Sequence, residues 1–152
     1  MKLSGLIEGW SEARDPEIAG LTADSRAVKP GFLFAALPGV KADGRSFIPK
    51  AVEAGAVAVI APPGTEAGVP VAASENPRKS FALAAAKFYG RQPETVAAIT
   101  GTNGKTSIAA FVRQIFAFCG RSAASMGTVG TVPPSGVRAL RHTTPDPVIV
   151  HQ

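Results

Sequence analysis

Short runs of apolar residues, each closed by turn residues, divide residues 1–94 into segments. Residues 32–37 read Phe-Leu-Phe-Ala-Ala-Leu and are followed by a Pro-Gly pair, and residues 56–61 read Ala-Val-Ala-Val-Ile-Ala and are followed by Pro-Pro-Gly. Continuous apolar runs of this length are typical of strands that are buried on both faces of a parallel sheet. The pattern therefore predicts two buried strands, at residues 32–37 and 56–61.

Helical spacing follows these predicted strands. Residues 46–54 have the pattern of a short helix that ends at Gly55. A longer helix is predicted from Asn76 as the N-cap, with Pro77 at the first helical position, to Gly90. Its predicted buried stripe consists of Phe81, Ala84, Ala85 and Phe88. Another short amphipathic helix is predicted near the start from Leu3, Leu6, Ile7 and Trp10. Strands that alternate with helices predict an α/β fold.

A strand, a glycine turn and a helix are predicted in succession after residue 95. Residues 96–99 are apolar and suit a buried parallel strand, and they lead into Gly-Thr-Asn-Gly-Lys-Thr at residues 101–106. A helix that ends near Gly120 is predicted from the spacing of Ile108, Phe111, Val112, Ile115 and Phe116. This order aims backbone N–H groups and the positive end of a helix at one point, which attracts phosphate.

The glycine spacing of this predicted phosphate loop is unusual. The common pattern G-x-x-x-x-G-K-[ST] requires glycine at position 99, which is Ile99, and the nearest upstream glycine is Gly101. An ordinary glycine turn between a strand and a helix is the alternative. If the loop binds phosphate, Lys105 is expected to reach the β- and γ-phosphates, and the Thr106 hydroxyl is expected to bind Mg²⁺.

A polar, proline-containing segment at residues 90–96 marks the predicted boundary between two domains, at residues 1–94 and 95–152. Beyond the predicted phosphate-loop helix, residues 121–132 suggest another strand that leads into a glycine-rich loop, and residues 133–147 suggest a loop or hairpin. A P-loop domain needs several parallel strands, and only about two are predicted here. We therefore expect the second domain to be incomplete.

Charge is distributed unevenly between these two parts. Residues 1–94 carry 11 Lys and Arg against 10 Asp and Glu, whereas residues 95–152 carry 5 against 1. The excess of positive charge around the predicted phosphate loop suits a polyanionic ligand, although simple solubility would also explain it. Nucleic acid is a weaker interpretation, because the basic residues are scattered and aromatic residues are not interleaved with them.

The composition suits a soluble protein of the cytoplasm. Of the 152 residues, 45% are hydrophobic, which is enough for a packed core, but no apolar run approaches the roughly 18 residues of a membrane span. The first residues do not resemble a signal peptide. The single cysteine, Cys119, excludes an internal disulfide, suits a reducing compartment and is interpreted as a small side chain at a helix end. We expect a cytoplasmic protein that binds neither a membrane nor nucleic acid.

Three parts of the sequence resemble the ATP-dependent Mur ligases of peptidoglycan synthesis, and they follow one another along the chain in the same order as in that family. Residues 99–107, Ile-Thr-Gly-Thr-Asn-Gly-Lys-Thr-Ser, resemble that family's phosphate loop, including its short glycine spacing. Residues 21–61 resemble its uridine-nucleotide-binding domain, which MurE and MurF ligases share. Met-Gly-Thr-Val-Gly-Thr-Val at residues 126–132 and His-Thr-Thr-Pro-Asp-Pro at residues 142–147 resemble substrate-contacting loops of the MurE group. The resemblance implies a small uridine-nucleotide-binding α/β domain followed by the start of a P-loop (Rossmann-like) ATP-binding domain.

The resemblance also implies roles for individual residues. The uridine part of the substrate would contact Ala23, Ser25, Val40, Lys41 and Ala42. ATP would contact Gly101, Thr102, Asn103, Gly104, Lys105, Thr106 and Ser107, with Thr106 also a ligand of Mg²⁺. The sugar-peptide part would contact His142, Thr143 and Thr144, where His142 replaces an asparagine that is common in the family. Outside the resemblance, Ser25 would be interpreted as a turn hydroxyl and Lys41 as a solvated charge.

The activity that the resemblance implies is the formation of an amide bond. The substrate would be UDP-N-acetylmuramoyl-L-alanyl-D-glutamate, whose free carboxylate is phosphorylated by ATP to an acyl phosphate and then attacked by the amino group of diaminopimelate or lysine. Diaminopimelate is the commoner amino acid in the family. The family's carbamylated lysine, further magnesium ligands and C-terminal domain match nothing here, so we expect binding of the UDP-sugar without turnover. A MurF-type ligase, a non-catalytic UDP-sugar-binding module and a small P-loop kinase are the alternatives.

Overall fold

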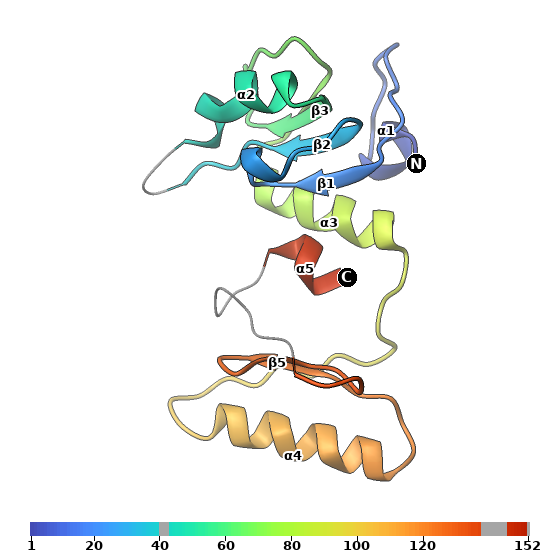
Figure 1. The fold of residues 1–152 in the computed structure, drawn as a ribbon, viewed down its shortest axis with the longest axis vertical. Helices are drawn as coiled ribbons and strands as arrows, with labels where there is room; N and C mark the ends of the chain where they lie inside the picture. The colour runs from blue at the N-terminus through green and yellow to red at the C-terminus, as the bar shows by residue number, and fades with distance from the viewer. Residues whose placement is uncertain (40–42, 138–145, 152) are drawn as a thin grey trace. The chain divides into compact units, whose positions relative to one another are not determined.

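The computed structural model describes residues 1–39, 43–137 and 146–151. It divides into two compact units. The first unit contains residues 1–92 together with the segment that begins at Asp146, and the second unit contains residues 93–145. The predicted α/β fold is confirmed, because the first unit combines a parallel sheet with helices on both of its faces (Figure 1).

Four parallel strands form the sheet of the first unit in the order β1-β2-β3-β4. They are β1 (Gly20–Thr22), β2 (Phe32–Ala35), β3 (Ala56–Ala61) and β4 (Val71–Ala73). Both predicted strands are confirmed, as β2 and β3, and the prediction has the same bounds as β3. The outer strands β1 and β4 were not predicted, because three residues are too few to show a pattern of burial.

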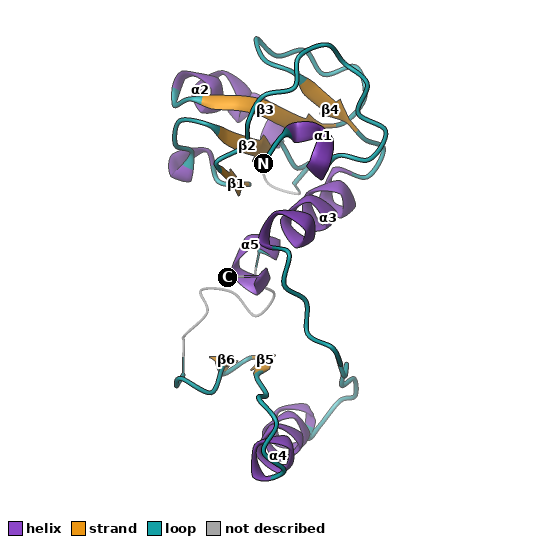
Figure 2. Cartoon of the chain, turned by 90° about the vertical axis from the view of Figure 1, so that its right-hand side faces the viewer, coloured by secondary structure: helices purple, strands orange, loops and turns teal. Residues whose placement is uncertain are grey.

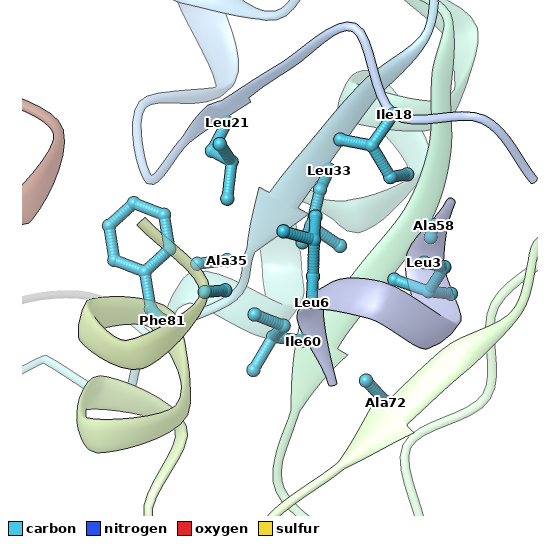
Figure 3. Close-up of a cluster of buried hydrophobic side chains, with 11 residues drawn as sticks. Leu3, Leu6, Ile18, Leu21, Leu33, Ala35, Ala58, Ile60, Ala72 and Phe81 are labelled. Atoms are coloured by element: carbon cyan, nitrogen blue, oxygen red, sulfur yellow. The ribbon is translucent and has the colours of Figure 1, made fainter. Parts of the chain in front are cut away.

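Apolar side chains cover the two faces of this sheet in separate clusters. Successive side chains of a strand point to opposite faces, so Leu33 and Ala35 of β2 belong to one cluster and Phe34 to the other. The first cluster is completed by α1 (Leu3–Leu6) and α3 (Pro77–Tyr89), as Figure 3 shows around Leu6 and Phe81. The second cluster is completed by α2 (Ile48–Glu53) on the opposite face (Figure 1).

The predicted helix at residues 76–90 is confirmed as α3. The side-chain oxygen of Asn76 accepts a hydrogen bond from the backbone N–H of Lys79 at 3.0 Å, which caps the first turn. The helix ends at Gly90, as predicted. Its predicted stripe faces the sheet: Phe81, Ala84 and Ala85 are buried, and Phe88 packs against the first cluster.

The shorter helices differ in detail from the predictions. The helix predicted at residues 46–54 forms as a 3-10 turn, η2 (Gly44–Phe47), that continues into α2. At the start of the chain, only Leu3–Leu6 is helical, and Ile7 and Trp10 pack against the first cluster from beyond the helix end. The terminal helix α5 (Pro147–His151) was not predicted.

Helix α5 packs against α3 within the first unit (Figure 2). The ring of His151 stacks on the ring of Tyr89 with 6.4 Å between centroids, and the His151 Nδ1 lies 3.2 Å from the side-chain nitrogen of Gln92. Val148 packs against the first cluster. Residues 146–151 therefore contribute to the hydrophobic packing of the first unit.

The described residues of the second unit, 93–137, form one helix and one hairpin. Helix α4 (Lys105–Phe118) contacts β5 (Ser125–Gly127), which pairs antiparallel with β6 (Gly130–Val132). The predicted helix and the predicted strand are both confirmed, and the strand continues into a hairpin. No residue of α4 is buried, and the apolar side chains of Phe111 and Ile115 are 62% and 60% exposed.

The prediction of a strand at residues 96–99 is wrong. These residues have no strand conformation, and Val96 is 76% exposed. A strand is stable only when its backbone N–H and C=O groups pair with those of a neighbour. Within the described part of the second unit, the two strands pair only with each other, so no neighbour is present for residues 96–99.

Candidate functional site

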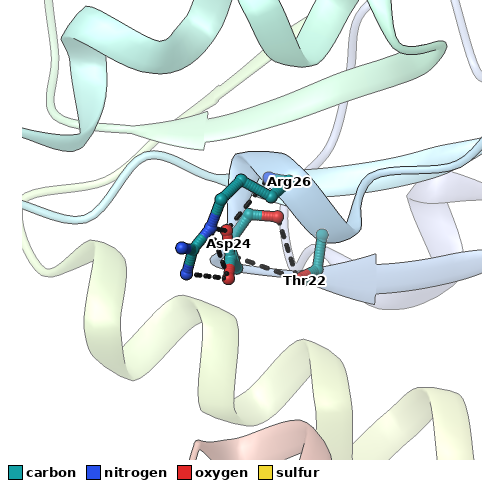
Figure 4. A network of polar contacts seen from close by, with 3 residues as sticks. All are labelled: Thr22, Asp24 and Arg26. Atoms are coloured by element: carbon teal, nitrogen blue, oxygen red, sulfur yellow. Dashed lines mark hydrogen bonds and ion pairs between the residues drawn. The ribbon is translucent and has the colours of Figure 1, made fainter.

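A tight turn follows β1 and holds two of the predicted substrate-binding residues. Asp24 caps the 3-10 helix η1 (Ser25–Ala27) by accepting a hydrogen bond from the backbone N–H of Arg26 at 2.9 Å. The guanidinium of Arg26 also donates to both carboxylate oxygens of Asp24, at 2.9 Å from Nε and 2.7 Å from a terminal nitrogen. Thr22 joins this network from the end of β1, as Figure 4 shows. These contacts hold the backbone of Ser25 between two fixed residues.

A second turn, in which an aspartate caps a 3-10 helix and bonds to an arginine two residues later, follows β2. Asp43 caps η2 by accepting from the backbone N–H of Arg45 at 2.9 Å, and the Nε of Arg45 donates to the other carboxylate oxygen at 2.8 Å. The hydrogen bonds from the Arg45 side chain hold the pKa of the Asp43 carboxyl below its ordinary value. The partnership with Asp43 likewise raises the pKa of Arg45, and Asp24 raises the pKa of Arg26.

Both turns lie at one edge of the sheet. Strands β1 and β2 are parallel neighbours, so their carboxyl ends lie side by side, and this edge is where ligands bind in open α/β sheets. The chain between β2 and η2 is closed at its base by a hydrogen bond of 3.1 Å from Gly44 N to Leu37 O. Arg78 of α3 donates to Pro38 O at 2.8 Å and so ties the start of this loop to the helix.

The structure brings two of the five predicted uridine-contacting residues to this edge. Ala23 directly follows β1 and is half-buried against the first cluster, and Ser25 is the half-buried first residue of η1. The other three lie outside the described residues: Val40, Lys41 and Ala42. The two Asp-x-Arg turns were not identified as site features, although Asp-Ser-Arg and Asp-Gly-Arg are visible as a repeated pattern in the sequence.

The predicted phosphate loop leads into α4 in the second unit. Residues 101–104 form the turn, and Lys105, Thr106 and Ser107 are the first helical residues. Gly104 is the N-cap, with φ of 76°, and Gly101 has φ of 140°; both values favour glycine. No side chain caps α4, whereas Asn76, Asp24 and Asp43 cap α3 and the two 3-10 helices. The N–H groups of the first turn of α4 are therefore not used by a capping side chain.

Two side chains of this loop make contacts that bear on nucleotide binding. The ammonium group of Lys105 donates to the carbonyl oxygens of Gly101 and Thr102, which places it over the loop. The hydroxyl oxygen of Thr106 lies 3.3 Å from that of Thr128, in the turn between β5 and β6. Thr128 lies in the loop at residues 126–132 that the resemblance assigns to substrate contact, but nothing in the local sequence indicates its contact with Thr106. The predicted residues His142, Thr143 and Thr144 lie outside the described residues.

Two sequence profiles of one family together match most of the chain. The profile of the Mur ligase family, catalytic domain, matches residues 17–100, and that of the Mur ligase middle domain matches residues 99–152. The chain belongs to the Mur ligase family. The family resemblance inferred from the sequence is therefore confirmed.

Two curated relatives that this chain resembles carry the same name. The chain is 54% identical over 153 residues to the UDP-N-acetylmuramoyl-L-alanyl-D-glutamate--2,6-diaminopimelate ligase of Rhizobium meliloti, covering 99% of this chain and 31% of the relative. It is 55% identical over 142 residues to the ligase of the same name from Caulobacter vibrioides, covering 88% of this chain and 29% of the relative. The chain thus spans about a third of the length of these relatives.

Solved structures give a consistent comparison. A UDP-N-acetylmuramoyl-L-alanyl-D-glutamate--2,6-diaminopimelate ligase aligns with a TM-score of 0.81 at 27% identity, over 99% of this chain and 32% of that chain. The MurF ligase of Thermotoga maritima, in complex with ADP, aligns with a TM-score of 0.54 at 28% identity, over 64% of this chain and 23% of that chain. The similarity to the diaminopimelate ligase therefore extends over more of the chain.

The residues of the phosphate loop suit ATP and Mg²⁺. Uncapped N–H groups, a lysine ammonium and the positive end of a helix are the donors that phosphate oxygens require. A hydroxyl at the first turn, here that of Thr106, is a hard oxygen ligand of the kind that Mg²⁺ prefers. Within residues 1–39, 43–137 and 146–151, no group of three or more His, Cys, Asp or Glu could hold a metal.

A depression elsewhere on the first unit does not fit the predicted ligands. It has a volume of about 440 Å³ and is lined by Glu12, Arg14 and residues 65–71, none of them a predicted site residue. Its lining carries the carboxylates of Glu12 and Glu66 against the single cation of Arg14, which does not suit an anionic nucleotide.

No helix among the described residues is long and apolar enough to cross a bilayer.

Proposed function

We propose that this chain is part of a MurE-type ligase that joins diaminopimelate to UDP-N-acetylmuramoyl-L-alanyl-D-glutamate at the expense of ATP. The observation that carries this proposal is the 54% identity to the Rhizobium meliloti ligase over 99% of the chain. The alignment to a solved ligase of the same name over 99% of the chain supports it, whereas the MurF alignment covers 64%. A cytoplasmic location follows from the proposed substrate.

We propose the domain division at residues 1–94 and 95–152, with the uridine nucleotide bound by the first part and ATP by the second. Ala23 and Ser25 would contact the uridine at the carboxyl end of β1, where the Asp24–Arg26 turn holds their backbone. Val40, Lys41 and Ala42 would complete this pocket, and His142, Thr143 and Thr144 would meet the sugar-peptide part. No catalytic residue is assigned within this chain.

The phosphate loop would act by binding and charge neutralisation. Gly101 to Ser107 would surround the triphosphate of ATP with backbone N–H groups, and Lys105 would leave its two loop carbonyls to contact phosphate oxygens. Thr106 would hold Mg²⁺, which, when bound, neutralises charge on the transferring phosphoryl group. Holding both reactants in a fixed geometry lowers the entropic part of the barrier to phosphoryl transfer.

The test is an amide-NMR titration of this chain, first with the UDP-muramoyl dipeptide and then separately with Mg·ATP. Saturable shifts at Ala23 and Ser25 with the dipeptide, and at Gly101 to Ser107 with Mg·ATP, are expected. Ser25→Ala should weaken dipeptide binding, and Ser11→Ala, at an exposed serine that is not a predicted site residue, serves as its control. Shifts with Mg·ATP but none with the dipeptide would contradict the proposal and favour a different P-loop enzyme.

The full activity requires a second experiment. This chain would replace the matching segment of the Rhizobium meliloti ligase, and the fusion would be assayed with diaminopimelate, with lysine and with a D-alanyl-D-alanine dipeptide as acceptor. Formation of a tripeptide product with diaminopimelate is expected. Because this chain is proposed to bind the UDP-linked substrate, use of a UDP-muramoyl tripeptide in place of the UDP-muramoyl dipeptide would instead assign the chain to the MurF type.

A further inference from the structure

The turn of the β5–β6 hairpin places a hydroxyl beside the predicted magnesium ligand. Thr128 Oγ1 lies 3.3 Å from Thr106 Oγ1, and the two residues are 22 positions apart in the chain. We propose that Thr128 is a positioning residue that orients the Thr106 hydroxyl for Mg²⁺ in the ATP complex. This inference rests on the proposed function, because it assigns a role within the proposed ATP site.

Either hydroxyl of this pair could be the donor, and the binding of Mg²⁺ would select Thr106. A hydroxyl has one hydrogen to donate and two lone pairs, and its hydrogen rotates to suit its neighbours. An oxygen that shares a lone pair with Mg²⁺ becomes a stronger donor, so its hydrogen needs an acceptor on the side away from the metal. Thr128 Oγ1 lies within reach to accept that hydrogen. With the hydrogen held there, the lone pairs of Thr106 are free to face the metal.

The hairpin is suited to hold this acceptor in place. Ser125 pairs with Val132, Met126 with Thr131 and Gly127 with Gly130, so Thr128 lies in a two-residue turn closed by strand pairing. The contact between β5 and α4 brings that turn to the first turn of the helix. The β-branched side chain of Thr128 also has few χ1 conformations to lose when it is fixed.

The experiment compares the affinity for Mg·ATP with the affinity for ATP in the presence of a chelator. Thr128→Val keeps the shape of the side chain and removes the acceptor. It is expected to weaken Mg·ATP binding by about 10- to 100-fold, the usual effect of removing a partner of a metal ligand, and to leave metal-free ATP binding unchanged. Thr128→Ser restores the hydroxyl and is expected to restore binding.

The matched control is Thr95→Val, the same substitution at an exposed threonine of the second unit. Thr95 is not a predicted site residue, and the described part of the chain shows no side-chain hydrogen bond to it. Thr95→Val should bind Mg·ATP and metal-free ATP as the unsubstituted chain does. Combining Thr128→Val with Thr106→Val should weaken Mg·ATP binding no further than Thr106→Val alone, because both changes remove one interaction.

Four outcomes would overturn the positioning role, and only the last of them would also overturn the proposed function. Equal loss of Mg·ATP and metal-free ATP binding in Thr128→Val would show a structural effect, as would changed amide shifts along α4. Binding equal to that of the unsubstituted chain, while Lys105→Ala loses binding, would overturn the role of Thr128 and leave the proposed ATP site standing. Absence of ATP binding by the unsubstituted chain would overturn both.

Discussion

Arg45 holds the carboxylate of Asp43 from two directions. Its backbone N–H donates to one oxygen at 2.9 Å, and its Nε donates to the other at 2.8 Å. After the neighbouring strand, Arg26 likewise contacts both oxygens of Asp24, with its backbone N–H on one and a terminal guanidinium nitrogen on the other. Each pair fixes a turn at the carboxyl edge of the sheet through bonds that depend on an ionised carboxylate, and this dependence leads to a prediction about pH.

Protonation of Asp43 should open its turn in acid. Its pKa is lowered chiefly by the hydrogen bond from the Arg45 side chain, then by the backbone N–H of Arg45. Because the folded pKa lies below the unfolded value of about 3.9, the carboxylate contributes stability above that value and loses it as the pH falls through the folded pKa. Stability should therefore be insensitive to this group between neutral pH and about pH 5, and decline below about pH 4.

The measurement must be specific to this residue, because hydrogen bonds from the backbone and hydroxyl of Ser4 also lower the pKa of Asp15. The side-chain carboxyl ¹³C shift of Asp43 should titrate below the ordinary range for aspartate. Arg45→Gln should move that titration up, towards the ordinary value, and leave Asp15 unchanged. An Asp43 titration that is the same with and without the Arg45 guanidinium would contradict the prediction.

A methyl group at Gly44 should distort the loop after β2. A Cβ at this position would lie 2.6 Å from both the backbone N and the backbone O of Leu37, and neither atom can rotate away. Gly44→Ala should lower the free energy of unfolding by about 1–3 kcal/mol, as other overpacked sites do. Chemical denaturation measures this loss, and UDP-sugar affinity should fall with it.

Gly68→Ala is the matched control for Gly44→Ala. No atom lies within 4 Å of a Cβ built at Gly68, which is also in the first unit. The control should retain the stability of the unsubstituted chain to within about 0.5 kcal/mol. If both variants unfold alike, the close approach of Gly44 to Leu37 carries no energetic cost.

Truncation of Phe81 should destabilise the first unit far more than truncation of a neighbour on the same helix. Phe81 lies in the first cluster (Figure 3) and is fully buried, whereas Leu83 is 50% exposed. Phe81→Ala should cost about 3–5 kcal/mol, since it removes a buried ring and leaves a cavity. Leu83→Ala should cost less than about 1 kcal/mol. Urea denaturation of both variants checks the difference, and similar costs would show that α3 does not pack as described.

Elements with strong local signals were predictable from the sequence. In β3, all six residues are apolar, and α3 has both a capping residue and a glycine stop, so pattern alone locates them. The strands β1 and β4 have three residues each and depend on pairing with their neighbours. The run at residues 96–99 has a strand pattern but no strand beside it among the described residues, so the pattern alone was insufficient.

In the candidate site, too, features with a local sequence signal were predictable and features that depend on packing were not. The turn at residues 101–104 and the helix that begins at Lys105 were predictable because the signals for both are contiguous in the sequence, whereas phosphate binding by this loop stays a prediction. The approach of Thr128 to Thr106 was not predictable, because it depends on how the hairpin packs on α4. The turns at Asp24 and Asp43 are intermediate: the repeated Asp-x-Arg pattern is local, but its place at one sheet edge follows only from the pairing of β1 with β2.

The last helix should stabilise the first unit although it follows the second unit in the chain. Val148 of α5 packs against the first cluster, and its backbone N–H donates to Asp146 Oδ1 at 2.8 Å, which caps the helix. Val148→Ala removes two partly buried methyl groups and should lower the free energy of unfolding by about 1 kcal/mol. Val150→Ala is the matched control, because Val150 lies in the same helix and is 47% exposed. Denaturation monitored at residues of the first cluster should separate the two variants. Equal stability of both would mean that α5 adds nothing to the packing of the first unit.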